Sequence, residues 1–122
     1  MRVGNRTPGA RLRVVLGPDV AIGPGKADLL DAIKATGSIA AAGRRMGMSY
    51  RRAWFLVDTM NACFRTPLVE TSRGGTGGGG HAGLTELGEE VLSRFRRMER
   101  ATATAVEPDM AALREKLAAR QG

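Results

Sequence analysis

The pattern of apolar and polar positions predicts a strand, three helices, a hairpin and a last long helix. Arg11–Leu16 begins with alternating positions and contains two adjacent valines, which favours a strand. The stretch "GPDVAIGPG" follows, and its two Gly/Pro breaks around a short apolar piece indicate a turn and a second short strand. From Lys26 the apolar positions recur at helical spacing up to Gly37, a natural helix stop.

Two further helices follow, each preceded by a serine that can cap it. Ser38 precedes the predicted helix Ile39–Met46, and Ser49 precedes a helix that runs to about Phe64. Gly47 breaks the chain between these two helices. The buried face of the second helix is predicted to carry Ala53, Val57, Met60 and Phe64, at i, i+4, i+7 and i+11.

A glycine-rich segment separates these helices from the last one. The run "LVETS" favours a strand, and "RGGTGGGGHAG" then contains seven glycines in eleven residues. Because short strand-like pieces bound the glycines, we interpret the segment as a β-hairpin, the wing of a winged helix. A phosphate-binding loop fits less well, because no GxxxxGK[ST] arrangement occurs. A flexible tip without function stays an alternative for the glycines themselves.

The last predicted helix begins at Thr85 and carries apolar residues at the spacing of a coiled-coil seam. The stretch "EPDM" is expected to interrupt it near Pro108, and a short final helix follows. The alternative to a seam is a helix packed on its own domain, and both can hold in different parts. The predicted dimer interface consists of Leu87, Val91, Phe95, Met98, Met110, Leu113 and Leu117.

The two central helices have the features of a helix-turn-helix. Ala40–Gly43 offers a small-residue surface on which a second helix can lie closely, and Gly47 supplies the turn. The fold class expected is mainly α with a small β component, a winged helix-turn-helix with a long C-terminal helix. The expected division is a flexible N-terminus (1–10), the winged helix-turn-helix domain with its dimerisation helix (11–106) and a short C-terminal helical extension (107–122).

Charge gives this unit a candidate partner. The chain carries a formal net charge of +7, and five cations but no acid lie between Asp31 and Asp58. Such a balance points to nucleic acid or an anionic surface, while an ordinary helical hairpin with a solvated charged face is the alternative. Double-stranded DNA is therefore the expected partner. The predicted DNA-contact residues are Ser38, Arg44, Arg45, Ser49, Tyr50, Arg51, Arg52, Arg73 and His81.

The same sequence offers little for catalysis or metal binding. Cys63 and His81 are the only residues of their types, so neither a disulfide within the chain nor a recognisable zinc or catalytic constellation is expected. No cofactor, no metal and no enzyme activity are predicted. An apolar run of transmembrane length is absent, as is a signal peptide, so we expect a cytoplasmic location.

The phrases "GSIAAAGRRMGMSYRRAW" and "LVET…GG…GGGG…LT" resemble the N-terminal DNA-binding domain of the molybdate-responsive repressor family (ModE type). The likeness runs from about Arg11 to about Met98, whereas LysR-type regulators share only a general skeleton. The resemblance implies a winged helix-turn-helix, a homodimer joined through its N- and C-terminal elements, and binding to palindromic DNA. Family members continue into a pair of oxyanion-binding domains, for which a chain ending at Gly122 has no room, so molybdate sensing is not expected to carry over.

The function hypothesis follows from these features. We expect a homodimeric, sequence-specific DNA-binding transcriptional regulator that inserts its recognition helices (about 49–64) into the major groove of a palindromic operator. Two alternatives stay open at this point. One is an architectural or non-specific nucleic-acid-binding protein, and the other is an interaction module that pairs with a larger regulator. A small-molecule or oxyanion effector is left open.

Overall fold

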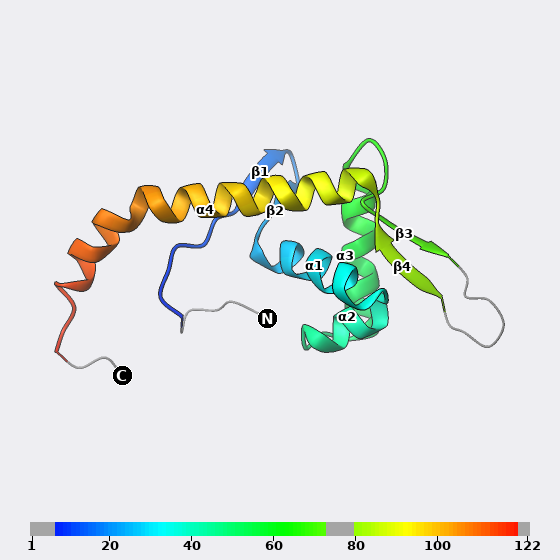
Figure 1. Cartoon of the computed structure of the whole chain (residues 1–122), viewed down its shortest axis with the longest axis horizontal. Helices are drawn as coiled ribbons and strands as arrows, with labels where there is room; N and C mark the ends of the chain where they lie inside the picture. Colours follow the sequence, from blue (N-terminus) through cyan, green and yellow to red (C-terminus); the bar gives the residue numbers. More distant parts are fainter. Residues whose placement is uncertain (1–6, 73–79, 120–122) are drawn as a thin grey trace.

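The structure, a computed structural model, describes residues 7–72 and 80–119 and forms four helices and two short hairpins (Figure 1). The elements are, in chain order, β1 (Val14–Gly17), β2 (Val20–Ile22), α1 (Pro24–Thr36), α2 (Ile39–Arg45), α3 (Tyr50–Cys63), β3 (Val69–Ser72), β4 (His81–Leu84) and α4 (Glu86–Arg114). Each corresponds to an element predicted from the sequence, although α4 extends past its predicted end near Pro108. The long helix α4 runs past the three shorter helices and extends beyond them (Figure 1).

Local capping explains where the helices begin and end. The side chains of Ser38, Ser49 and Thr85 each accept a hydrogen bond from the backbone N–H three residues on, at 3.0, 3.0 and 2.9 Å. Such a cap contributes about 1 kcal/mol, because it satisfies a donor that the first helical turn leaves unpaired. Gly37 ends α1 in the left-handed conformation, with φ of 71°. The caps predicted from the sequence are confirmed.

The hydrophobic core lies where the three short helices meet the first half of α4. Its largest fully buried side chains are Leu29, Leu30, Ile33, Val57, Met60, Leu68 and Phe95. They come from α1, α3, α4 and the segment before β3, so the core joins the helical unit to the long helix. No helix of the described chain is long and apolar enough to cross a membrane.

Helices α2 and α3 approach each other at a glycine. A Cβ added at Gly43 would lie 3.1 Å from the Cβ of Ala53, closer than a side chain tolerates without a shift. The backbone N–H of Met48 donates to the Gly43 carbonyl at 2.9 Å, and Gly47 adopts a φ of 71° in the turn. The small residues and the turn glycine thus allow the close crossing that the sequence predicts.

The strands form two separate hairpins. β1 pairs with β2 in an antiparallel ladder that contains an irregularity, and β3 pairs with β4 in a regular one. Each ladder is a sheet of only two strands. The second hairpin is tied to the helices by a hydrogen bond from the Ala82 N–H to the Gly37 carbonyl, at 2.8 Å.

The expected fold class is corrected by this arrangement. Four helices with two independent two-stranded antiparallel sheets form a mixed fold, and not plainly a winged helix-turn-helix with a long C-terminal helix. The physical reason is that the strands pair only locally, within each hairpin, so they build no common sheet against the helices among the described residues. The glycine-rich tip that was interpreted as a wing falls within 73–79 and lies outside the described residues.

A second correction concerns the last helix. The sequence suggests an interruption near Pro108, but α4 continues through it to Arg114. Pro108 and Thr104 are both exposed, so water can satisfy the Thr104 carbonyl that a proline leaves without its helical donor. An ion pair between Glu107 and Arg114, at 2.9 Å, spans about two turns of the helix across Pro108.

Candidate functional site

Four arginines on α2 and α3 form the most distinctive polar surface of the chain. Arg44 and Arg45 end α2, whereas Arg51 and Arg52 stand in the first turn of α3, and all four are exposed. We call them the arginine surface. In residues 7–72 and 80–119, none of the four forms a salt bridge with a carboxylate. Their charge is therefore available to an anionic partner.

Aromatic side chains lie beside these cations. Tyr50 and Phe55 are 61% and 58% exposed, which is unusual for rings of this size. Tyr50 contacts Trp54 edge to face, with ring centroids 6.3 Å apart. The guanidinium of Arg52 lies over the ring of Phe55, 5.7 Å from its centroid. The first half of α3 thus presents rings and cations together.

The two serines predicted to contact DNA have structural tasks. Ser38 is half-buried, and its hydroxyl oxygen accepts from the Ala41 N–H at the start of α2. Ser49 does the same at the start of α3, where the donor is the Arg52 N–H. Only Ser49 is exposed, so it alone of the two lies on the surface that the arginines form.

The predicted set also contains two residues of the predicted β-hairpin, Arg73 and His81. A Cβ added at Gly37 would lie 2.9 Å from Cε1 of His81, so the imidazole packs against the end of α1. Arg73 lies outside the described residues. Of the predicted set, Arg44, Arg45, Ser49, Tyr50, Arg51 and Arg52 lie at the end of α2 and the start of α3, whereas His81 packs against Gly37.

The predicted dimer positions divide into two groups. Phe95 is 1% exposed in the core of its own chain, and Leu87 and Val91 pack against that core. Met110 is half-buried, and the exposed members are Met98, Leu113 and Leu117. The first part of the seam therefore serves the chain's own fold.

An apolar groove opens beside Met98. It encloses about 180 Å³ between the first hairpin and α4, and its lining includes Val14, Leu16, Phe64 and Val91. Leu16 is 59% exposed. This groove joins exposed apolar residues of β1 to the predicted seam on α4.

Sequence reasoning missed a salt-bridge network that fastens α1 to α4. Arg96 donates to Asp28, Asp31 and Glu99, and its side chain is only 26% exposed. Burial by itself would lower the pKa of Arg96, but the hydrogen bonds that it donates to Glu99, Asp28 and Asp31 outweigh this effect and raise the pKa above its ordinary value. Asp28 and Arg96 are 68 positions apart, so no local pattern could have indicated the contact.

A second missed residue is Asn61 in α3. Its side-chain oxygen accepts from the backbone N–H groups of Leu68 and Val69, at 2.8 and 3.1 Å, and its amide donates to the Val69 carbonyl at 3.1 Å. The three bonds satisfy the backbone where β3 begins. A polar residue next to a helical apolar stripe was the only sequence signal for it.

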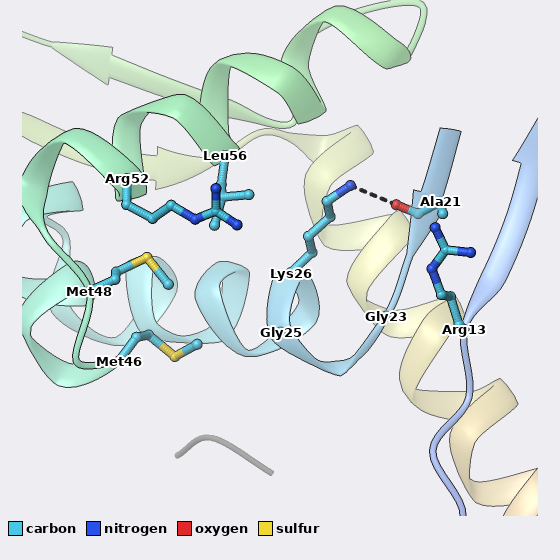
Figure 2. A pocket seen from close by; sticks show the side chains of 9 residues that line it. All are labelled: Arg13, Ala21, Gly23, Gly25, Lys26, Met46, Met48, Arg52 and Leu56. Atoms are coloured by element: carbon cyan, nitrogen blue, oxygen red, sulfur yellow. Dashed lines mark hydrogen bonds between the residues drawn. The ribbon is translucent and has the colours of Figure 1, made fainter. Parts of the chain in front are cut away.

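A cationic pocket lies between the first hairpin, the start of α1 and the start of α3 (Figure 2). It encloses about 480 Å³ and is lined by Arg13, Lys26 and Arg52 over apolar groups that include Met48 and Leu56. The ammonium of Lys26 donates to the Ala21 carbonyl at 2.9 Å. The three cations come from three segments, which is why the sequence pattern did not reveal the pocket.

Metal chemistry finds no support in the described part of the chain. No group of three or more His, Cys, Asp or Glu side chains is arranged there to hold a metal ion. Cys63 is a half-buried free thiol.

No family model matches the chain. Over 85 residues it is 41% identical to the molybdenum-pterin-binding protein MopA of Rhodobacter capsulatus, a match that covers 70% of this chain and 32% of that protein. It is 42% identical over 82 residues to MopB of the same organism, covering 67% and 30%. It is 38% identical over 72 residues to the DNA-binding transcriptional dual regulator ModE of Escherichia coli K12, covering 59% and 27%. The chain thus spans about a third of the length of these relatives, or less.

These matches correct the resemblance drawn from the sequence. The first two relatives are named for binding molybdenum-pterin, and the shared segment is only about 30% of each. The assignment to the N-terminal winged-helix DNA-binding domain of the ModE type is therefore wrong. The same holds for the likeness to a LysR-type helix-turn-helix.

The function expected from the sequence is corrected for the same reason. The names of MopA and MopB concern molybdenum-pterin binding, and nothing in these matches gives this chain specificity for a DNA sequence. The hypothesis of a sequence-specific transcriptional regulator acting on a palindromic operator is therefore wrong. None of the three names describes an enzyme.

Proposed function

We propose that the arginine surface of this chain contacts double-stranded DNA. We also propose that the chain is a homodimeric, non-catalytic module of a cytoplasmic protein whose role involves molybdenum. The observation that carries the proposal is the arginine surface itself, with Arg44, Arg45, Arg51 and Arg52 exposed and without carboxylate partners in the described chain. The proposal concerns contact with the DNA backbone. It includes neither a preferred sequence nor a role in transcription.

In the described chain, some arginines elsewhere in the molecule form salt bridges, unlike the four of the arginine surface. Arg94, Arg96 and Arg114 on α4 each form at least one salt bridge with an acid. A chain that leaves four neighbouring guanidiniums unpaired while pairing others retains a local positive potential. A phosphate backbone is a polyanion that such a potential attracts, because binding releases condensed counterions. One relative's name includes DNA binding, which supports the choice of partner.

The homodimer rests on a separate observation. Val15, Leu16 and Met98 are 61%, 59% and 39% exposed, and the last two line the apolar groove. Exposed apolar side chains that converge on one groove favour association, because burying them removes them from water. A second copy of the same face would cover them.

The test is a titration of short double-stranded DNA of mixed sequence, followed by fluorescence anisotropy at several salt concentrations. Replacing Arg51 by Ala should weaken binding and lower the slope of log K against log salt by about 0.9 if one phosphate contact is lost. The matched control is Arg97→Ala, which removes the same charge from an exposed position of α4. Equal losses in the two variants, or no binding by the parent chain, would overturn the proposal.

A further inference from the structure

The cationic pocket combines three positively charged side chains with backbone and apolar groups. Arg13, Lys26 and Arg52 line it together with backbone at Gly23 and Gly25, and none of its lining residues is an acid. In the described chain, no carboxylate forms a salt bridge with any of the three cations. Three like charges that share one cavity repel each other, so an anion between them would relieve an unfavourable interaction.

The arrangement of the side chains supports a ligand between them. Figure 2 shows Lys26 extending from α1 between Arg52 of α3 and the strand that carries Ala21, with Arg13 on the far side of that strand's carbonyl. Lys26 donates one of its three ammonium hydrogens to Ala21. The remaining hydrogens and the planar donors of the arginines are the charged donor groups that bind oxyanion oxygens most strongly.

The pocket also has an apolar floor. Met46 is 2% exposed, and Met48 and Leu56 are half-buried beside it. Charges over apolar groups interact more strongly than charges in open water, because the local dielectric constant is lower. The volume of about 480 Å³ exceeds what a single bare oxyanion fills, so a bound ion would keep part of its water shell.

We propose that this pocket binds a free, doubly charged tetrahedral oxyanion of the phosphate, sulfate or molybdate type, held by Arg13, Lys26 and Arg52. The inference stands on the cavity and its cations, and it does not require the proposed contact with DNA. A phosphodiester of DNA offers related chemistry with a single charge. The two sources differ in charge and size, so experiment can separate them.

The experiment is equilibrium dialysis of the whole chain against phosphate, sulfate and molybdate in turn, at constant ionic strength set with chloride. Binding should saturate at one oxyanion per chain, and each ion should raise the melting temperature. Lys26→Gln should weaken this binding at least about tenfold, the loss typical of one charge-assisted hydrogen bond. Arg97→Gln is the matched control and should leave binding unchanged.

Arg13→Gln provides a second variant that cannot fail through misfolding of the core, since Arg13 is exposed. It should also weaken oxyanion binding, while the melting temperature without ligand should stay the same or rise slightly, because one of the repelling charges is removed. The proposal is overturned if no oxyanion is retained at constant ionic strength, or if Arg97→Gln reduces binding as much as Arg13→Gln. Retention of short double-stranded DNA at this pocket, without retention of free oxyanions, would equally overturn it in favour of a backbone phosphate.

Discussion

Arg96 of α4 donates a hydrogen bond to the carboxylate of Asp28 in α1, at 2.7 Å, and so fastens the long helix to the helical unit. The side chain of Asp28 is only 13% exposed, and its second oxygen has no hydrogen-bond partner in the described chain. The charged form of Asp28 therefore depends on Arg96. Without Arg96 the largely buried carboxylate would have lost its counter-charge, and this would destabilise the fold by more than the intact ion pair stabilises it.

We expect Arg96→Met to lower the free energy of unfolding by about 2–3 kcal/mol, because Asp28 would lose its counter-charge. Arg96→Lys should recover only part of this, since one ammonium cannot reach three carboxylates as a guanidinium does. The control Arg94→Met removes an exposed pair with Glu90 and should cost less than about 1 kcal/mol. Urea unfolding followed by circular dichroism measures all three, and equal effects at positions 96 and 94 would contradict the prediction.

Asn61 gives a second prediction about stability. Asn61→Ala leaves the buried N–H groups at the start of β3 without an acceptor, and we expect a loss of about 2–3 kcal/mol. Thr59→Ala on the same helix removes only a bond to the Phe55 carbonyl within the helix and should cost much less. Hydrogen exchange should show faster exchange at Leu68 and Val69 in the Asn61 variant only. Unchanged protection there would refute the assigned role.

Two helical glycines differ in the space around them, so substituting each by alanine gives a matched comparison. A Cβ added at Gly88 would collide with the carbonyl oxygen of Leu68, whereas a Cβ at Gly25 would meet nothing within 4 Å. Gly88→Ala should therefore destabilise the fold by about 1–3 kcal/mol, because the backbone before β3 would have to move. Gly25→Ala should be neutral or stabilising by up to about 1 kcal/mol, as expected inside a helix. Thermal unfolding distinguishes the two, and a stable Gly88→Ala variant would show that the contact is adaptable.

If the chain forms the proposed homodimer, its measured molecular mass should rise with protein concentration. Leu16→Glu places a charge in the apolar groove and should shift the chain from dimer to monomer, because the carboxylate would be buried at the interface. Leu113→Glu changes an exposed residue outside the groove and tests whether the far end of α4 takes part. Size-exclusion chromatography with light scattering measures the mass. A parent chain that stays monomeric at all concentrations would rule out the homodimer.

Arg52 belongs both to the arginine surface and to the cationic pocket, so the two proposed ligands should compete. We expect molybdate or phosphate to weaken binding of double-stranded DNA at constant ionic strength, and Arg52→Gln to weaken both interactions. Arg44→Gln should affect DNA alone, since Arg44 does not line the pocket. Fluorescence anisotropy with added oxyanion measures the competition, and its absence would mean that the two sites act independently.

The parts of the structure that the sequence predicts well are local ones. Ser38, Ser49 and Thr85 cap their helices, and Gly43 and Gly47 allow the crossing of α2 and α3, because each depends on neighbours within a few residues. A residue type at a helix end or in a turn carries its own physical reason, and such reasons are visible in a single sequence.

The parts that the sequence did not predict depend on distant partners. Arg96 meets Asp28 across 68 positions, and Lys26 shares a pocket with Arg13 and Arg52 only because a hairpin and two helices converge. His81 was predicted from its place beside the glycines, and its packing on Gly37 joins residues 44 positions apart. The apolar seam was likewise ambiguous, because spacing alone cannot say whether Phe95 faces its own core or a second chain.

The long helix α4 has one further consequence. Its first half is fixed by Phe95 and Arg96, whereas the described residues after Glu99 are mostly exposed. An isolated helix of about fifteen residues is only marginally stable in water, since the first turn is costly to form. Here the fixed half supplies that turn as a template, so the outer half can grow from it at little cost. The chain thereby carries a projecting rod of about 20 Å, at about 1.5 Å per residue, whose order depends on an anchor at its other end.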